Sequence, residues 1–175
     1  MSFLRNSVLG VGMALLISTP AMAAERVVFK YRILRESVSV PELATFAQTG
    51  EASSNLQTYF RLSGQRPETV RTTLTRPIKV DPVLLDRVLN SPIGNTVLDQ
   101  LGQAIQTPRG GAERQALRAA LTLSASGDNT ITLVEILQNY PTQEVIVDGD
   151  RIEGAYRRLN NFIDRLRNPL QNIFR

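Results

Sequence analysis

Alternating or unbroken apolar runs at two distant places in the chain predict β-strands, since successive side chains of a strand point to opposite faces. Near the N-terminus the alternation predicts one strand over residues 27–33, in which Val27, Phe29, Tyr31 and Ile33 share a face. Residues 145–147 are an apolar, β-branched run that predicts the second strand. Residues 78–80, which follow a proline, are long enough only for a brief extended segment.

Between the two strands, apolar residues recur at intervals of three and four, the spacing of helices with one buried face. Several of these stretches begin with a serine or aspartate followed closely by proline, which predicts a capped helix start. Glycine or proline marks several of the ends. The predicted helices lie between Ser39 and Gly50, between Ser53 or Ser54 and Gly64, between Pro67 and Pro77, from Pro82 to Leu89, from Pro92 to Ile105, from about Ala112 to Ser124 and from Ile131 to Asn139.

The longest predicted helix runs from Asp150 to Asn168, before Pro169. Its apolar positions form a clean stripe that is wide enough to dock and still leave apolar area for another contact. The stripe consists of Ile152, Tyr156, Leu159, Phe162, Ile163 and Leu166.

These elements predict a mainly α (α+β) fold, a compact bundle of seven to eight short helices with a small two- or three-stranded β element. The strands at 27–33 and 145–147 flank the helical run, so their pairing would close the fold, with residues 78–80 as a candidate third strand. The length of 175 residues suits one domain, which we assign to residues 24–168, with residues 169–175 as a C-terminal tail.

Residues 1–23 have the three parts of a secretory signal peptide. Arg5 supplies positive charge, residues 8–18 are apolar, and Ala21-Met22-Ala23 is a small-x-small cleavage site. As a helix the apolar run would cover only about 16 Å of a hydrocarbon core about 30 Å thick. We therefore expect cleavage between Ala23 and Ala24, export to the periplasm, the thylakoid lumen or the medium, and no membrane span after removal of the signal.

The sequence contains neither histidine nor cysteine, and this excludes several classes of chemistry. A Ser-His-Asp triad, a cysteine nucleophile, a thiolate or imidazole metal site and a disulfide each need one of these residues. The motifs G-x-S-x-G, G-x-G-x-x-G and G-x-x-x-x-G-K-[ST] are also absent, and we predict no cofactor.

Charge argues against a nucleic-acid partner, because the formal net charge is only +4. A series of arginines at steps of five would wind around a helix and not line one face. The series comprises Arg61, Arg66, Arg71 and Arg76.

The densest acidic group, Asp148, Asp150 and Glu153, lacks the spacing of a calcium loop. We predict that Asp150 caps the last helix and that Asp128 serves a turn or a cap. Glu153 is placed to pair with Arg157, four residues later on the same helix face. Carboxylates that meet only in the folded chain, as in glycoside hydrolysis, leave no signal in the sequence.

Six short motifs in order resemble a known family over about residues 25 to 166, nearly the whole mature chain. It is the uncharacterised cyanobacterial domain found, behind a signal peptide, as the N-terminal part of secreted alpha/beta-hydrolase-like proteins. The motifs are Ala24-Glu25-Arg26 before the first strand, Ser37-Val38-Ser39 before Leu43 and Phe46-Ala47, Val80 to Leu84, Ser91 to Gly94, Ala116 to Leu121, and Tyr140-Pro141.

The resemblance implies that in two-domain relatives a catalytic hydrolase domain follows, whereas here we expect that domain to be missing. The resemblance implies no catalytic residue within this domain. A description of this chain as a hydrolase would therefore refer to the neighbouring domain of its relatives.

The export signal, the missing histidine and cysteine and the resemblance together indicate an exported, non-catalytic protein-interaction or regulatory module. Its expected partner is another exported protein, such as a hydrolase. The alternative is a carrier of a lipid or pigment, or a small carboxylate-based hydrolase, using Tyr59 or Tyr156 beside an apolar pocket. A tyrosine on an apolar helix face is more often part of the core. An apolar cavity on the order of several hundred cubic ångströms would favour the carrier, and a solid core would contradict it.

The C-terminal tail contains three large apolar residues, Leu170, Ile173 and Phe174, which form a candidate interaction surface unless the tail folds back onto its own core. Truncation after Asn168 separates the two cases. If the tail is an interface, the free energy of unfolding changes by less than about 0.5 kcal/mol while association is lost. If the tail is buried, Ile173 and Phe174 each contribute about 1.5–3 kcal/mol. Denaturant unfolding and size-exclusion chromatography measure the two effects.

Overall fold

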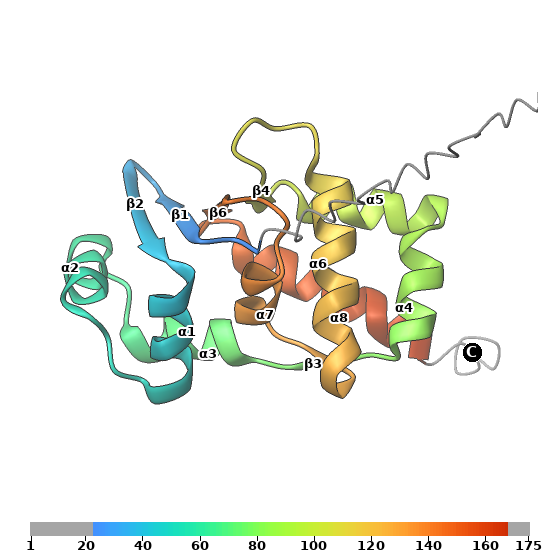
Figure 1. Cartoon of the computed structure of the whole chain (residues 1–175), viewed down its shortest axis with the longest axis horizontal. Coiled ribbons are helices and arrows are strands. Elements are labelled where there is room, and N and C mark those ends of the chain that lie inside the picture. The colour runs from blue at the N-terminus through green and yellow to red at the C-terminus, as the bar shows by residue number, and fades with distance from the viewer. Residues whose placement is uncertain (1–22, 168–175) are drawn as a thin grey trace, which may run out of the picture.

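The computed structural model describes residues 23–167, which form eight helices and six strands (Figure 1). The predicted class, mainly α with a small β element, is confirmed, and the β element has more strands than predicted. The helices are α1 Val40–Thr49, α2 Ser54–Ser63, α3 Pro67–Thr75, α4 Pro82–Leu89, α5 Pro92–Leu101, α6 Glu113–Asp128, α7 Leu133–Gln138 and α8 Ile152–Arg167. The strands are β1 Arg26–Tyr31, β2 Leu34–Ser39, β3 Ile78–Lys79, β4 Ile105–Gln106, β5 Thr130–Ile131 and β6 Glu144–Asp148.

The larger sheet has the strand order β2-β1-β6-β4 and pairs the first strand of the described chain with the last. β1 pairs antiparallel with β2 and parallel with β6, so that Val27 lies opposite Val145. The predicted pairing of the first and last strands is therefore confirmed. The candidate third strand lies elsewhere: β3 pairs with β5 in a separate sheet, with Ile78 opposite Ile131.

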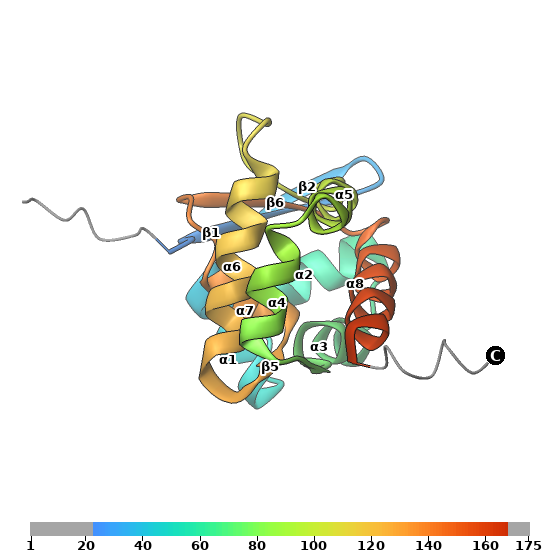
Figure 2. The same cartoon turned by 90° about the vertical axis from the view of Figure 1, so that its right-hand side faces the viewer.

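One face of the larger sheet is packed against the helices. The core includes Val27 of β1 and Val145 of β6, whereas Val28 and Ile146, their neighbours on the opposite face, are buried but lie outside this cluster. Figure 2 shows most helices below the sheet and the loop at residues 107–112 rising above it. The sheet therefore separates a helix-covered side from a side on which this loop stands.

Four of the predicted helix starts are confirmed by their caps. Four side chains each accept a hydrogen bond from the backbone amide three residues later, which satisfies an otherwise free donor of the first turn. The side-chain oxygen accepts from the amide nitrogen at 3.3 Å for Ser39 and Glu42, 3.2 Å for Ser53 and Leu56, 2.8 Å for Asp81 and Leu84, and 3.2 Å for Ser91 and Gly94.

The N-terminal strand is shorter than predicted, because the chain reverses at Arg32 and Ile33 and returns as β2. Ile33 lies at the tip and is 98% exposed, so the prediction that it shares a strand face with Val27 and Phe29 was wrong. The Arg32 backbone has a φ of 54°, and its amide donates to Asp150 Oδ2 at 3.0 Å. α8 begins only at Ile152, so the prediction that Asp150 caps it was also wrong: the carboxylate stabilises the hairpin turn.

Three other bounds differ from the prediction. Ile105, predicted at the end of a helix, lies in β4 and pairs with Val147. α6 continues past Ser124 to Asp128. The helix predicted from Ile131 begins instead at Leu133, because the residues before it pair as β5 and Thr132 forms a capping box with Glu135.

Not every residue of the predicted apolar stripes is buried. Leu62, Ile93 and Leu123 are 56%, 69% and 54% exposed. The stripe of α8, by contrast, packs on the rest of the molecule: Leu159, Phe162 and Ile163 are buried, and the others are half-buried against the core. None of the helices in the described region is both long enough and apolar enough to cross a membrane.

The close approach of α4 and α5 depends on Gly94. A Cβ atom there would lie 2.1 Å from the carbonyl oxygen of Val88 and 2.6 Å from Cα of Leu89, which are backbone atoms that cannot move independently. We expect Gly94→Ala to lower the free energy of unfolding by about 3 kcal/mol, although alanine is the better helix former. Chemical denaturation measures the change.

Gly127→Ala in α6 is the matched control, because a Cβ there meets nothing within 4 Å. It should leave stability unchanged or raise it by up to about 1 kcal/mol. Equal effects of the two substitutions would contradict the steric explanation.

Candidate functional site

The loop at residues 107–112, which connects β4 to α6, is the most prominent projection of the described chain (Figure 1). Gly110 and Gly111 have φ angles of 72° and 87°, in the region that favours glycine. The Gly110 amide donates to the Thr107 carbonyl at 3.2 Å, which closes the turn with Arg109 at its exposed tip.

Glu113, the first residue of α6, holds both ends of this loop. Its Oε1 accepts from the backbone amide of Thr107 at 3.2 Å and from Thr107 Oγ1 at 2.8 Å, and its Oε2 accepts from the Gly111 amide at 2.7 Å. Partial burial pushes the pKa of Glu113 up, but the hydrogen bonds from Thr107 and Gly111 outweigh it and hold the pKa below 4.5. Glu113 is therefore ionised near neutral pH, and the loop is tied down by charge-assisted hydrogen bonds.

The loop separates two open concavities of about 750 and 690 Å³, and Thr107, Pro108, Arg109 and Gly110 line both. The larger lies between the loop, the end of α5 and the larger sheet. Its charged residues are Lys30, Asp99, Arg109, Glu113, Arg114 and Arg151.

Half of these charged residues are in ion pairs. Arg114 forms a bidentate contact with Asp99, at 2.8 Å from Nε and 2.6 Å from Nη2, and the hydrogen bond from Arg114 lowers the pKa of Asp99. Arg151 lies 3.3 Å from Asp148. Among the residues that the structure describes, Lys30 and Arg109 have no carboxylate partner.

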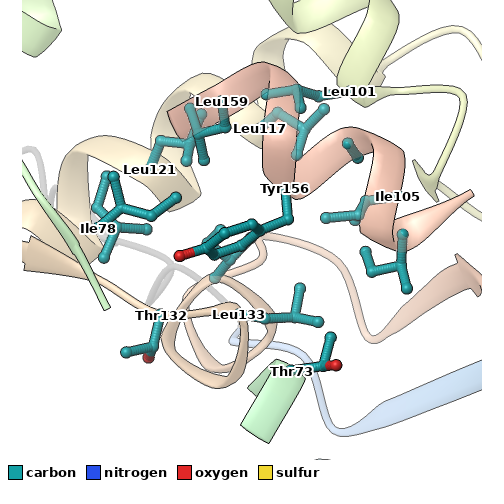
Figure 3. Close-up of a pocket in the computed structure, with 14 residues that line it drawn as sticks. Thr73, Ile78, Leu101, Ile105, Leu117, Leu121, Thr132, Leu133, Tyr156 and Leu159 are labelled. Atoms are coloured by element: carbon teal, nitrogen blue, oxygen red, sulfur yellow. The ribbon is translucent and has the colours of Figure 1, made fainter. Parts of the chain in front are cut away.

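The apolar pocket predicted beside Tyr156 exists but is small. Figure 3 shows the Tyr156 ring across a hollow lined by residues such as Leu117, Leu133 and Leu159. Its volume is about 30 Å³, and a neighbouring hollow that includes Tyr59 measures about 90 Å³. Both fall far below the volume expected for a lipid or pigment carrier.

Tyr59 belongs to the core, and Tyr156 is half-buried against it. Tyr59 is 7% exposed and packs against Phe29 and Phe60, with ring centroids at 5.7 and 6.1 Å. Burial raises its pKa above 10.0. The guanidinium carbon Cζ of Arg76 lies 3.6 Å from the ring centroid of Tyr156, and Arg76 Nη2 lies 2.7 Å from Glu153 Oε2. The predicted partner of Glu153, Arg157 on its own helix, was therefore wrong.

Two arginines of the series, Arg71 and Arg76, connect different elements. Arg71 donates to the carbonyls of Ala47 and Gln48 at 3.0 and 2.8 Å, at the end of α1. Arg76 joins α3 to α8 through the contacts above. Outside the series, Arg118 of α6 donates to the Leu89 carbonyl at 3.2 Å. These guanidinium groups stabilise the fold and do not form one surface.

The acidic residues near β6 do not converge. Asp148 accepts from the Asp150 amide at 3.1 Å, Asp150 binds the hairpin turn, and Glu153 binds Arg76. Within residues 23–167 no group of three metal-ligating side chains is present. The turn role predicted for Asp128 is confirmed, because it accepts from the amide and hydroxyl of Thr130 at 2.9 and 2.6 Å, which lowers the pKa of Asp128.

Tyr140 is a buried polar residue for which the sequence predicted no chemical role. It is fully buried, and its hydroxyl has no hydrogen-bond partner in the described structure. Burial, with a smaller contribution from the charge of Glu113, raises its pKa far above 10.0.

The two terminal predictions lie at or beyond the limits of the described residues. Ala23 is exposed, whereas Ala24 is 6% exposed and belongs to the core. Leu170, Ile173 and Phe174 lie outside the described residues. Glu113, Lys30 and Arg109 were not predicted as site residues. For Glu113 the sequence holds a weak signal, because a glutamate in the first helical turn after a Gly-Gly loop can accept hydrogen bonds from the loop amides.

The loop should depend on ionised Glu113. Because the folded pKa lies below the unfolded value of 4.5, Glu113 stabilises the protein above pH 4.5, and this contribution is lost as the pH falls through the folded pKa. We expect Glu113→Gln to lower the free energy of unfolding at pH 7 by about 1–2 kcal/mol, because the side-chain NH2 group of glutamine would face a hydrogen-bond donor of the loop where the carboxylate has an acceptor. The variant should also lose less stability on acidification than the wild type in pH-dependent denaturation.

Glu51→Gln, which removes an exposed carboxylate between α1 and α2, is the control and should leave the loop unchanged. Amide hydrogen exchange at Gly111 reports the loop directly. Unchanged protection of Gly111 in Glu113→Gln would contradict the proposed tie.

Comparison with known proteins identifies a family and nothing finer. No curated protein and no solved structure matches the chain. Residues 23–148 match the family described as alpha/beta hydrolase of unknown function (DUF1400). This match spans most of the chain, from the residue before Ala24 through β6. The chain therefore belongs to the DUF1400 family.

Proposed function

We propose that this protein is an exported, non-catalytic interaction module that binds another exported protein through the loop at residues 107–112. The observation that carries the proposal is the loop itself, which projects between two open concavities and is fixed by Glu113. A fixed loop loses little conformational entropy on binding, which favours association.

The chemistry of the larger concavity fits binding better than acid-base catalysis. A general acid needs a carboxyl group whose pKa is raised toward neutral pH. The pKa values of Asp99 and Glu113, the two carboxyl groups that line it, are both lowered. Both carboxylates already accept hydrogen bonds within the protein: Asp99 from Arg114, and Glu113 from the amide of Gly111 in the loop.

The hydrolase in the family description is the main competing function. We propose that this activity belongs to a neighbouring domain in relatives, because a histidine-dependent triad cannot form in a sequence without histidine. We also propose that the hydrolase itself is the kind of exported partner that this module binds. Purified residues 24–175 should show no turnover of ester, phosphate or glycoside substrates, and robust turnover by a clean preparation would contradict the proposal.

Binding is tested by affinity recovery of the tagged mature protein from its own envelope fraction. The wild type should recover a defined protein, and Arg109→Glu at the loop tip should lose most of it. Arg61→Glu makes the same charge change on α2, away from the loop (Figure 1), and should bind as the wild type does. Equal recovery by both variants would exclude the loop as the contact. A mature N-terminus other than Ala24 in the exported protein would contradict the proposed processing.

A further inference from the structure

We infer that the larger concavity beside the loop binds a carboxylate-rich peptide segment of the partner, an inference that rests on the interaction function proposed above. The concavity is the space of about 750 Å³ between the loop, the end of α5, the start of α6 and strands β1 and β6. Two of its four cationic side chains, Lys30 and Arg109, form no ion pair with a carboxylate among the described residues.

The distribution of charge favours an anionic occupant. Four cationic side chains line the concavity, against the two carboxylates of Asp99 and Glu113. Asp99 is neutralised by a bidentate contact with Arg114, and Glu113 is occupied by the amides of the loop. Glu113 keeps its negative charge, and Arg151 is paired with Asp148, so four cations against three carboxylates leave a net charge of +1 in and beside the concavity. A partner with complementary carboxylates would be attracted to this positive charge and oriented by it.

The positions of Lys30 and Arg109 favour an extended ligand with more than one carboxylate. Lys30 lies in the middle of the sheet on β1, half-buried, whereas Arg109 stands at the exposed tip of the loop. The two cations thus come from different elements, the sheet and the loop, that line the same concavity. A peptide with several carboxylates offers one anionic group to each of them.

The remaining lining suits a peptide backbone. Gln103, Gln106 and Gln115 contribute amides, which offer both donors and acceptors. The lining contains no aromatic residue on which a nucleobase could stack. Polar amides beside unpaired cations match the alternating amide groups and carboxylates of an acidic segment.

The cations are held on fixed supports. Lys30 belongs to a strand paired on both sides, with β2 and β6. The backbone around Arg109 is fixed by Glu113 and by the hydrogen bond from Gly110 to Thr107. The site therefore needs little rearrangement to receive a ligand, which reduces the entropic cost of binding.

The test uses a fluorescein-labelled peptide that alternates glutamate and glycine, and the same peptide with glutamine at every glutamate. Fluorescence anisotropy with the mature protein should show at least about tenfold tighter binding of the glutamate peptide, with affinity falling as salt is added. The double variant Lys30→Glu with Arg109→Glu should weaken binding of the glutamate peptide by more than about tenfold. Unchanged denaturation midpoints establish that this variant is folded.

Arg61→Glu with Lys79→Glu is the matched control, because both residues are exposed, lie outside the concavity and give the same change in net charge. The control should bind the glutamate peptide as the wild type does. Equal binding of the two peptides, or equal weakening by the two double variants, would overturn the inference. If Arg109→Glu nevertheless abolishes partner recovery from the envelope fraction, the interaction function stands and only the acidic ligand is excluded.

Discussion

The parallel pairing of β1 with β6 is the constraint on which the rest of the structure depends. Parallel neighbours need a crossover, and here the crossover contains β2 and all helices from α1 to α7. The register places Val27 opposite Val145, and together these side chains reach the core. Because side chains alternate along a strand, the same register sends Val28, Lys30 and Ile146 to the opposite face. One pairing therefore decides both which face the helices cover and where the unpaired Lys30 ammonium lies.

The elements that could be predicted from the sequence are those specified by neighbouring residues. Ser39, Asp81 and Ser91 mark helix starts because each cap is complete within one helical turn. The two-residue strands β4 and β5 were missed, since two residues carry no periodicity and their pairing depends on residues distant in the chain. The β1–β2 turn was missed for another reason: alternation continues on both sides of Arg32 and Ile33, and neither is a typical turn residue.

The candidate site was harder to predict than the fold, because its contacts join elements that are distant in sequence or share no motif. The absence of histidine and cysteine excludes catalysis and metal binding by these side chains, but it does not indicate where in the chain a site lies. Glu153 and Arg76 illustrate the difficulty: a local rule pairs Glu153 with Arg157, whereas the folded chain brings Arg76 of α3 against both Glu153 and Tyr156. A stacked arginine that also forms an ion pair gains more than an exposed pair on one helix, so the tertiary contact prevails.

Glu113 both fixes the conformation of the loop and contributes a charge to the concavity. A carboxylate in this position would normally reduce the positive potential around Arg109. Here its oxygens are occupied by the neutral donors of Thr107 and Gly111, whereas the charge of Asp99 is balanced by Arg114. The contacts that fix the loop therefore hold the Glu113 carboxylate in place and leave Lys30 and Arg109 without an ion-pair partner among the described residues. Since fixed groups keep their geometry when a ligand arrives, the arrangement supports the binding function that we propose.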